Sequence, residues 1–376
     1  MAGAALVRVA VAGAGAFGRN HLRVLRELET AGEGAALVAA VEPDPKRAEE
    51  AQAHFSIPVF SSVDALLAAD LKLDAACVAV PTVQHHAVAA ALLEAGLDLL
   101  VEKPLAAHLP EADELIRLQG KKGRILQPGH LERFNPAVLA IEPRLTRPMF
   151  FEAHRLSVFT PRALDVDVVL DLMIHDLDIV LTFAASPVRE VRAVGLPILS
   201  PRVDIANVRV EFESGCVANF TASRVSTERV RKLRFFEPRQ YVSIDYARRD
   251  LLVISVDSQA GPLPAELAAA LAAGKINSAD LAKFAAAGAA STAPELTPGL
   301  IPGLTPGFKF IKPEVAPGEP LRLEILSFLE SVRTRRPPKV TARQGRAALE
   351  LALQIQSAMA AHADRAGLGD FFKAGP

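Results

Sequence analysis

A glycine-rich turn lies between an apolar run and a helical segment near the start of the chain. Residues 7–12 are apolar except for Arg8, as expected of a parallel strand that is buried on both faces. Gly13-Ala14-Gly15-Ala16-Phe17-Gly18 follows this run, and residues 18–29 carry apolar side chains at helical spacing. A strand, a glycine turn and a helix in this order predict the first strand–helix unit of a parallel α/β sheet.

Each glycine of this turn has its own physical task. Gly13 permits the tight turn, Gly15 lets a pyrophosphate approach the backbone, and Gly18 lets the helix pack closely on the strand. The helix that begins after Ala16 and Phe17 offers free N–H groups and the positive end of its dipole to phosphate groups. The turn therefore predicts a site for a dinucleotide.

A carboxylate ends the second predicted strand, residues 37–42. At this position Glu42 can accept hydrogen bonds from both hydroxyls of the adenosine ribose. The same carboxylate would repel a 2′-phosphate, so NAD is favoured over NADP. Lys46 and Arg47 follow closely and could hold a phosphate, and a helix-capping or solvated acid is the alternative interpretation of Glu42.

Strand-like and helical signals alternate up to about the first third of the chain. The further strand-like runs are residues 37–42, 59–60, 74–80, 98–101 and 124–127. This alternation predicts right-handed crossovers and a parallel sheet. Beyond Phe134, strands follow one another through short turns such as Glu213-Ser214-Gly215, which predicts an antiparallel sheet. We therefore predict an α/β Rossmann domain, followed by an α+β domain with a mainly antiparallel open sheet.

The change of pattern places the domain boundaries. We predict an NAD-binding domain at residues 1–130, a domain for substrate binding and oligomerisation at 131–340, and a closing helix and tail at 341–376. Residues 258–308 form an insert that is alanine-rich in its first half and repeats a four-residue unit in its second. The repeats are Thr297-Pro298-Gly299-Leu300, Ile301-Pro302-Gly303-Leu304 and Thr305-Pro306-Gly307-Phe308. Such dense Pro-Gly punctuation forms turns, so a surface segment is expected.

Composition excludes several classes of partner. The 376 residues include 42 basic and 43 acidic side chains, without the basic excess that is typical of nucleic-acid-binding proteins. No run of roughly 18 apolar residues lacks a charge or a breaker, so no membrane insertion is expected. Cys77 and Cys216 lie in apolar, strand-like runs and are expected to be buried thiols in a reducing compartment. These features predict a cytoplasmic protein.

A lysine follows the fifth predicted strand directly. Glu102-Lys103-Pro104 stands at the carboxyl end of that strand, where open α/β sheets bind their ligands. Lys103 is therefore placed to reach the nicotinamide and the group that reacts with it, and Pro104 fixes the chain just after it. We count Glu102 and Lys103 among the cofactor-binding residues, with a solvated charge as the alternative for the lysine.

Charged residues interrupt an otherwise apolar segment with helical spacing, residues 168–183. Asp171 and His175 are four residues apart, so they share a helix face and can touch. Three interpretations stay open: a structural Asp–His pair, a metal site, and an acid/base pair in which Asp171 orients His175. Because the segment has one histidine and no second cluster, no metal is predicted.

Taken together, these motifs resemble the glucose–fructose oxidoreductase, inositol dehydrogenase and rhizopine catabolism family, abbreviated Gfo/Idh/MocA. The matching elements are the glycine turn, Pro81-Thr82-Val83-Gln84-His85, Glu102-Lys103-Pro104, and Asp171 with His175. The resemblance covers nearly the whole chain except residues 258–308. It implies that Lys103, Asp171 and His175 line a substrate site beside the nicotinamide and act in catalysis.

The same resemblance implies that Pro81, Thr82 and His85 lie near the nicotinamide ribose. Thr82 stands where the family commonly has asparagine, and a purely structural histidine is the alternative for His85.

Residues 129–136 and 222–226 resemble a narrower group of this family, the UDP-N-acetylglucosamine 3-dehydrogenases. That resemblance implies oxidation of a sugar 3-hydroxyl with NAD, ahead of a transamination that makes a diamino sugar for lipid A. His130, Arg133 and Arg224 are the candidate substrate-binding residues, because guanidinium groups hold diphosphate oxygens bidentately. An ordinary salt bridge is the alternative for either arginine.

We therefore predict an NAD-dependent dehydrogenase that oxidises a nucleotide-sugar hydroxyl to a ketone. His175, held by Asp171, is the first choice for the base, and Lys103 stabilises the developing alkoxide or shares the proton. Two alternatives stay open: an inositol or free-sugar dehydrogenase, and a non-catalytic NAD(H)-binding regulatory protein. An apolar sheet face predicts a homodimer or homotetramer, and a pathway aminotransferase is a further candidate partner.

Overall fold

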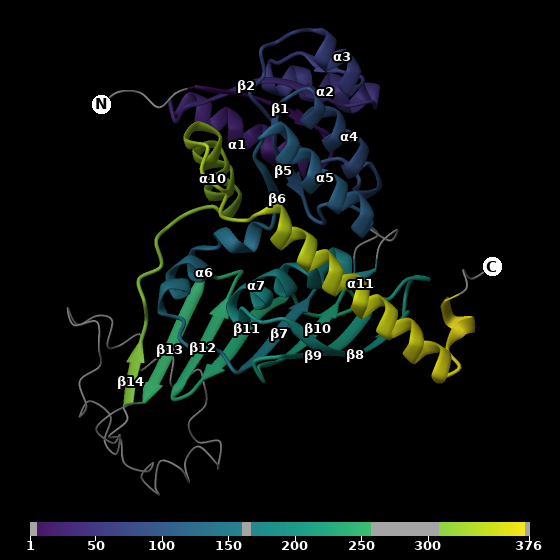
Figure 1. Cartoon of the computed structure of the whole chain (residues 1–376), viewed down its shortest axis with the longest axis vertical. Helices are drawn as coiled ribbons and strands as arrows, with labels where there is room; N and C mark the ends of the chain where they lie inside the picture. Colours follow the sequence, from purple (N-terminus) through teal and green to yellow (C-terminus); the bar gives the residue numbers. More distant parts are fainter. Residues whose placement is uncertain (1–5, 160–166, 257–307, 373–376) are drawn as a thin grey trace, which may run out of the picture. The chain divides into compact units, whose positions relative to one another are not determined.

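The computed structural model describes residues 6–159, 167–256 and 308–372, and the chain divides into two compact units (Figure 1). The first unit takes the chain up to Phe134 and, from much later in the sequence, Gly318–Leu353. The second unit takes the chain from Asn135 to Pro317 and the part from Gln354 onward. Of the predicted insert, residues 258–307 lie outside the described residues. The boundaries at residues 130 and 340 stay a prediction.

A six-stranded sheet forms the centre of the first unit. Its strands are β1 (Val7–Ala12), β2 (Ala35–Val41), β3 (Val59–Phe60), β4 (Ala75–Val78), β5 (Asp98–Glu102) and β6 (Leu126–Gly129). The strand order is β3-β2-β1-β4-β5-β6, and every neighbouring pair is parallel. Strand β1 is buried almost throughout because neighbouring strands and helices cover it, which explains its apolar run.

Helices connect these strands and cover the sheet. They are α1 (Gly18–Thr30), α2 (Pro45–Phe55), α3 (Val63–Ala68), α4 (Thr82–Glu94), α5 (Leu109–Lys122) and, from the later segment, α10 (Pro320–Thr334). The short helix η1 (Leu131–Phe134) follows β6, and α10 contacts α1, β1, β5 and η1. Val9 of β1, Leu25 of α1 and Phe328 of α10 belong to one buried cluster, so α10 completes the core of the first unit (Figure 1).

The strand order locates a switch point in this sheet. The chain runs outward from β1 to β2 and β3, and then returns to place β4 on the other side of β1. The connections that leave the carboxyl ends of β1 and β4 therefore diverge. Open α/β sheets bind ligands in the crevice at such a point, and the glycine turn stands there.

An eight-stranded sheet forms the second unit, in the order β14-β13-β12-β11-β7-β10-β9-β8. The strands are β7 (Phe150–Leu156), β8 (Val188–Leu196), β9 (Ile205–Phe212), β10 (Val217–Ser223), β11 (Val230–Glu237), β12 (Gln240–Asp245), β13 (Asp250–Val256) and β14 (Phe308–Ile311). All pairs are antiparallel except β7 with β10. The predicted fold class, a parallel α/β domain and an α+β domain with a mainly antiparallel sheet, is confirmed.

Helices α6 (Pro136–Ile141) and α7 (Ile174–Ala184) lie along the sheet of the second unit (Figure 1). The short helices η2 (Glu142–Arg144) and η4 (Gly369–Phe372) also belong to it, whereas α11 (Ala342–Arg365) continues from the first unit into the second. The helix predicted over residues 168–183 does not begin as a regular α-helix. Its first part is a π-helical turn, η3 (Val169–Met173), from which α7 continues.

Candidate active site

The turn after β1 requires glycine at its first and last positions. Gly13 has a φ of 95°, in the left-handed region, and a Cβ there would lie 2.6 Å from the carbonyl oxygen of Ala79. A Cβ on Gly18 would overlap the carbonyl oxygen of Gly13. A Cβ on Gly15, in contrast, meets no heavy atom within 4 Å. The turn thus packs tightly against the backbone at Gly13 and Gly18 and leaves open space at Gly15.

The helix after this turn begins without a side-chain cap. Phe17 stands at the N-cap of α1 and makes no capping hydrogen bond, and both Ala16 and Phe17 are exposed. Uncapped N–H groups beside the open space at Gly15 suit an anion, because the helix dipole adds its positive end there. The residues present therefore fit the pyrophosphate of a dinucleotide.

Glu42 comes directly after β2 and ties that strand to the glycine turn. Its side chain is buried, and Oε2 accepts the Ala14 N–H at 2.9 Å. Oε1 accepts the Asp44 N–H at 3.1 Å and the Arg47 guanidinium at 3.0 Å. Asp44, not Glu42, caps α2, so Glu42 is neither a helix cap nor a solvated acid. Its role toward the ribose stays a prediction.

His85 joins the loop after β4 to the turn after β5. Its buried ring places Nδ1 at 2.7 Å from the Pro104 carbonyl oxygen and Nε2 at 2.9 Å from the Val80 carbonyl oxygen. Burial lowers the pKa of His85 below its ordinary value, although these two carbonyls act in the opposite direction. Pro81 is exposed and Thr82 half-buried at the start of the same helix, α4. Their contacts with a nicotinamide ribose stay predictions.

Lys103 stands immediately beyond β5, at the carboxyl edge of the sheet. It is half-buried, whereas Glu102 and Pro104 on either side of it are buried, and the Lys103–Pro104 peptide is cis. The structure thus brings the glycine turn, the start of α4 and the Glu102-Lys103-Pro104 turn to one edge of the sheet in the first unit. These are the segments in which the sequence predicts the cofactor-binding residues.

Sequence reasoning missed His21, which lies on the buried face of α1. Its Nε2 lies 2.8 Å from Oε1 of Glu102, and the edge of its ring meets Phe17 with ring centroids 5.7 Å apart. A signal for it existed, because His21 occupies a position of the apolar stripe that also holds Leu25 and Leu28. A polar residue in such a stripe requires a buried partner.

His130 and Arg133 both belong to the first unit and are buried, at 1% and 3% exposure. His130 follows β6, and Arg133 lies in η1. At the start of α11, a Cβ on Gly345 would lie 2.5 Å from Pro128 and 3.7 Å from Nε2 of His130, so this helix packs closely on the end of β6. The predicted contacts of His130 and Arg133 with substrate stay predictions.

Asp171 and His175 lie in the second unit, on either side of the change from η3 to α7. Both are half-buried, and Asp167 accepts the N–H groups of Val169 and Leu170 at 2.8 and 3.1 Å where the helical segment begins. A π-helical turn is rare and occurs frequently at functional sites. Lys103 belongs to the first unit, whereas Asp171 and His175 belong to the second. The roles of Asp171 and His175 in proton transfer stay predictions.

Asp176, the next acid in this apolar helix, forms a structural pair. Its carboxylate accepts two hydrogen bonds from Arg155, Nε to Oδ2 at 2.7 Å and Nη2 to Oδ1 at 2.9 Å. Both side chains are 3% exposed, and the Arg155 guanidinium lies 5.2 Å from the ring centre of Tyr246. Bidentate pairing of this kind satisfies a buried charge.

Arg224 also forms a buried pair, with Asp204. Nε of Arg224 donates to Oδ1 of Asp204 at 2.7 Å, and Nη2 lies 3.2 Å from the hydroxyl of Ser200. The salt-bridge alternative therefore describes Arg224 as the structure places it, and its contact with a substrate diphosphate stays a prediction. Burial by itself raises the pKa of Asp204, but hydrogen bonds from Ile198, Ser200 and Arg224 more than offset it and lower the pKa to about 2.

We predict that Asp204→Asn lowers the free energy of unfolding by about 2 to 4 kcal/mol at neutral pH. The carboxyl has a pKa near 3.9 in the unfolded chain, so its contribution is complete above about pH 4 and is lost as the pH falls through about 2. The difference between wild type and variant should therefore narrow below about pH 4. Urea unfolding followed by circular dichroism measures it, because the chain has no tryptophan. Glu190→Gln, at an exposed ion pair with Arg192, is the control and should change little.

The remaining sequence predictions concern metals, membranes and thiols. Among the described residues, no group of three or more His, Cys, Asp or Glu is arranged to hold a metal ion. No helix in the described ranges is long and apolar enough to span a bilayer. Cys77 and Cys216 are both buried, as predicted, and burial raises the pKa of both thiols, that of Cys216 to about 11.

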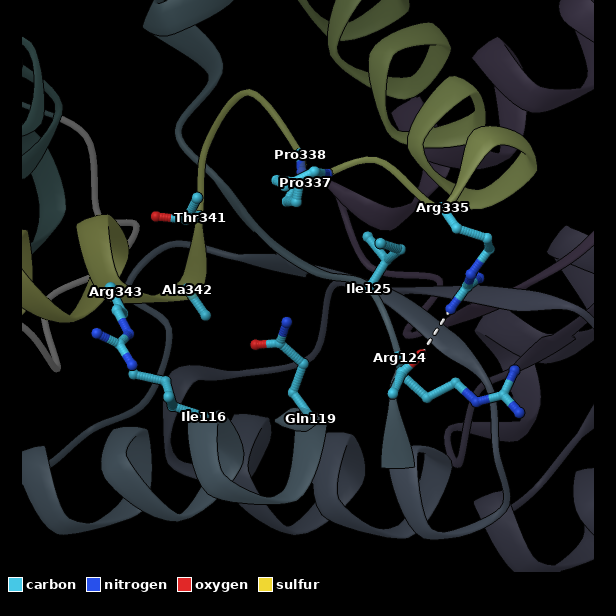
Figure 2. A pocket seen from close by; sticks show the side chains of 11 residues that line it. Ile116, Gln119, Arg124, Ile125, Arg335, Pro337, Pro338, Thr341, Ala342 and Arg343 are labelled. Atoms are coloured by element: carbon cyan, nitrogen blue, oxygen red, sulfur yellow. Dashed lines mark hydrogen bonds between the residues drawn. The ribbon is translucent and has the colours of Figure 1, made fainter. Parts of the chain in front are cut away.

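A pocket of about 430 Å³ opens near the amino end of β6 in the first sheet (Figure 2). Ile125, which precedes β6, lines it together with Arg124, Arg335 and Arg343. Figure 2 shows Arg335 reaching the end of α5, where it donates to the Gly123 carbonyl at 2.8 Å. This pocket lies at the amino ends of the strands, so it is separate from the carboxyl ends, where the glycine turn and Lys103 lie.

Comparison with known proteins identifies the family. The model of the Gfo/Idh/MocA oxidoreductase family, NAD-binding Rossmann fold, matches residues 7–130. The model of the C-terminal domain of the same family matches residues 138–238. The prediction of NAD as the cofactor is confirmed by this match.

Named relatives point in the same direction. UDP-N-acetylglucosamine 3-dehydrogenase of Acidithiobacillus ferrooxidans is 36% identical over 246 residues, which cover 65% of this chain and 76% of the relative. The solved structure of that enzyme, GnnA, superposes with a TM-score of 0.77 at 31% identity, covering 94% of this chain and 97% of GnnA. scyllo-Inositol 2-dehydrogenase (NAD(+)) of Bacillus subtilis is 28% identical over 235 residues, 58% of this chain and 68% of the relative. The chain therefore belongs to the Gfo/Idh/MocA family of NAD-binding oxidoreductases.

Proposed function

We propose that the chain is an NAD-dependent dehydrogenase that oxidises carbon 3 of UDP-N-acetylglucosamine to a ketone. The observation that carries this proposal is the 36% identity to a UDP-N-acetylglucosamine 3-dehydrogenase over 76% of that enzyme. It is supported by the lysine at the carboxyl edge of the first sheet, beside a glycine turn that fits a dinucleotide. A 3-keto sugar is a substrate for transamination, so an aminotransferase and the synthesis of a diamino sugar for lipid A are part of the same proposal.

The proposed chemistry divides the work among three side chains. Bound NAD supplies the acceptor for the hydride that leaves the sugar carbon. His175 accepts the proton of the hydroxyl, and Asp171 orients its ring and stabilises the charge that it gains. Lys103 donates to the oxygen as negative charge develops on it. We assign diphosphate binding to Arg133 and Arg224, and contact with the sugar to His130.

The two units have separate tasks in this proposal. The first binds NAD through Gly13, Gly15, Gly18 and Glu42, and the second supplies the substrate-binding sheet. We also propose self-association through this sheet, in the cytoplasm. In support, Phe150, Phe236 and Tyr241 are half-buried neighbours on it, with ring centroids 5.5 and 5.2 Å apart for the successive pairs.

A second function is favoured by the similarity to inositol dehydrogenases, whose matches include the 28% identical enzyme of Bacillus subtilis. In this alternative the same residues oxidise a ring hydroxyl of a free polyol, and no diphosphate is bound. Arg224, which is held by Asp204, would then be purely structural. The two functions therefore differ in whether the nucleotide is needed for turnover.

A substrate panel tests the proposal. The purified chain is mixed with NAD and with UDP-N-acetylglucosamine, other UDP-sugars, inositols or free hexoses, and NADH absorbance is followed. We expect kcat/KM to be at least about tenfold higher for UDP-N-acetylglucosamine than for any inositol, with a product that lacks the hydrogens of one CH–OH group. Turnover of inositols or free sugars alone would establish the second function. NADH binding without turnover of any compound would favour a regulatory protein.

A further inference from the structure

Two buried histidines hold the residues on either side of Lys103. His21, from α1, lies 2.8 Å from the carboxylate of Glu102, and His85, from α4, lies 2.7 Å from the carbonyl oxygen of Pro104. Both rings are 1% exposed. The backbone that carries Lys103 is therefore connected through side chains to two different helices.

The surroundings of Glu102 leave it little freedom. Its side chain is 11% exposed, and a Cβ on Gly129, in the neighbouring strand β6, would lie 3.1 Å from its Cδ and Oε1. Burial raises the pKa of the Cys77 thiol, and the negative charge of Glu102 adds to this effect. A carboxylate in such surroundings requires a donor, and Nε2 of His21 is in position to supply one.

The same geometry indicates which ring nitrogen of His21 carries the proton. Nδ1 of His21 is buried and has no hydrogen-bond partner among the described residues. A ring with its proton on Nε2 donates to Glu102 and leaves Nδ1 without an N–H to satisfy. His21 thus works as a fixed donor to one carboxylate oxygen.

The position of His21 in the chain gives this hydrogen bond a second consequence. His21 lies three residues after Gly18, in the first turn of the helix whose N terminus suits the pyrophosphate. The His21–Glu102 pair therefore connects α1, which follows the glycine turn, to the turn that carries Lys103.

We propose that His21 is a positioning residue for Lys103, acting through its hydrogen bond to Glu102. The proposal rests on the function assigned to Lys103 above. Removal of the donor leaves a buried carboxylate that must find another partner. The Glu102-Lys103-Pro104 turn then shifts, and the Lys103 ammonium leaves its place at the edge of the sheet. Such misplacement costs roughly 10- to 100-fold in turnover even when no reacting group is lost.

The test compares a variant that keeps the donor with one that removes it. Gln can place an amide N–H close to the position of Nε2, so His21→Gln should resemble wild type, whereas His21→Leu keeps the volume but lacks a donor. For each variant, the reactivity of Lys103 toward acetic anhydride is measured against pH by peptide mass spectrometry. We expect the Lys103 profile to shift and kcat to fall roughly 10- to 100-fold in His21→Leu, with a smaller change in KM for NAD, and both to be near wild type in His21→Gln.

A double variant separates positioning from stability. Replacement of both partners of a buried pair by apolar groups is often nearly neutral for stability, so His21→Leu/Glu102→Leu should fold even where His21→Leu does not. The double variant also lacks the hydrogen bond that links α1 to the Glu102-Lys103-Pro104 turn, so it should still show a shifted Lys103 profile. The matched control is His86→Leu on α4, whose half-exposed ring lies 3.0 Å from Glu114, and it should leave Lys103 unchanged.

A wild-type Lys103 profile in folded His21→Leu, or in the double variant, would overturn the proposal. Because the labelling needs no substrate, it still reports on His21 if the substrate panel shows no turnover. Turnover by wild type together with an unshifted Lys103 profile would reject the role of His21 and leave the proposed function intact.

Discussion

Lys103→Met should lose turnover by roughly 100- to 1000-fold, with a much smaller loss of NADH affinity. The lysine stands directly after β5, at the edge of the sheet that carries the glycine turn, and its two neighbours are held by buried histidines. In the proposed mechanism, a lysine whose backbone is held in this way meets the reacting oxygen with little reorganisation, which is the condition under which a charge stabilises a transition state strongly. Met keeps the length of the side chain and removes the charge.

A second substitution at the same position separates charge from proton transfer. Lys103→Arg retains a positive charge, but a guanidinium does not give up its proton in proteins. Substantial turnover by Lys103→Arg would assign the lysine to charge stabilisation and the proton to His175, whereas turnover as low as that of Lys103→Met would indicate that the lysine shares the proton. Initial rates with NAD and the nucleotide sugar measure kcat, and NADH fluorescence measures binding.

Lys121→Met, at an exposed position in the last turn of α5, is the matched control for loss of a lysine in the same unit. It should change neither rate nor binding. If Lys103→Met keeps a kcat close to that of wild type, Lys103 has no part in the chemistry.

The first unit was predictable from local patterns because the edge that carries the candidate site is built from consecutive strand–helix units. Strands β1, β2 and β4 are mainly apolar runs, and all six parallel strands end at the same edge. The residues after β1, β4 and β5 therefore come together without any knowledge of distant contacts. For this reason, the sequence allowed the placement of the glycine turn and of Lys103 at this edge to be predicted. The packing of α10 in the first unit could not be predicted from local patterns, because Phe328 packs against core residues that lie about three hundred positions earlier in the sequence.

Pairs of buried charges were the part of the site that single motifs could not reveal. The sequence shows that Arg224 and Asp176 are charged. Their partners, Asp204 and Arg155, lie 20 and 21 residues earlier in the chain, on other segments of the second unit. An arginine that binds phosphate and an arginine that neutralises a buried acid have the same sequence signature. Their environment, and not their spacing, separates the two roles.

The largest effect on the fold is expected from a single methyl group in the glycine turn. In Gly18→Ala, the new Cβ would overlap the carbonyl oxygen of Gly13, a backbone atom that cannot rotate away. The start of α1 must then move from β1, and we expect a loss of about 3 kcal/mol or more in the free energy of unfolding, together with loss of NADH binding. Urea unfolding by circular dichroism and titration with NADH measure the two effects.

Gly15→Ala should separate cofactor binding from folding. A Cβ at Gly15 meets nothing within 4 Å, so the free energy of unfolding should change by less than about 1 kcal/mol. The same methyl would occupy the space through which a pyrophosphate approaches the backbone, so NADH affinity should fall about tenfold or more. Gly120→Ala is the matched control, since it also meets open space but lies in α5, where alanine should stabilise the helix by about 0.5 to 1 kcal/mol without an effect on NADH. Wild-type affinity in Gly15→Ala would mean that the pyrophosphate does not pass over this residue, and the assignment of the glycine turn to the cofactor would then rest on Gly13 and Gly18 alone.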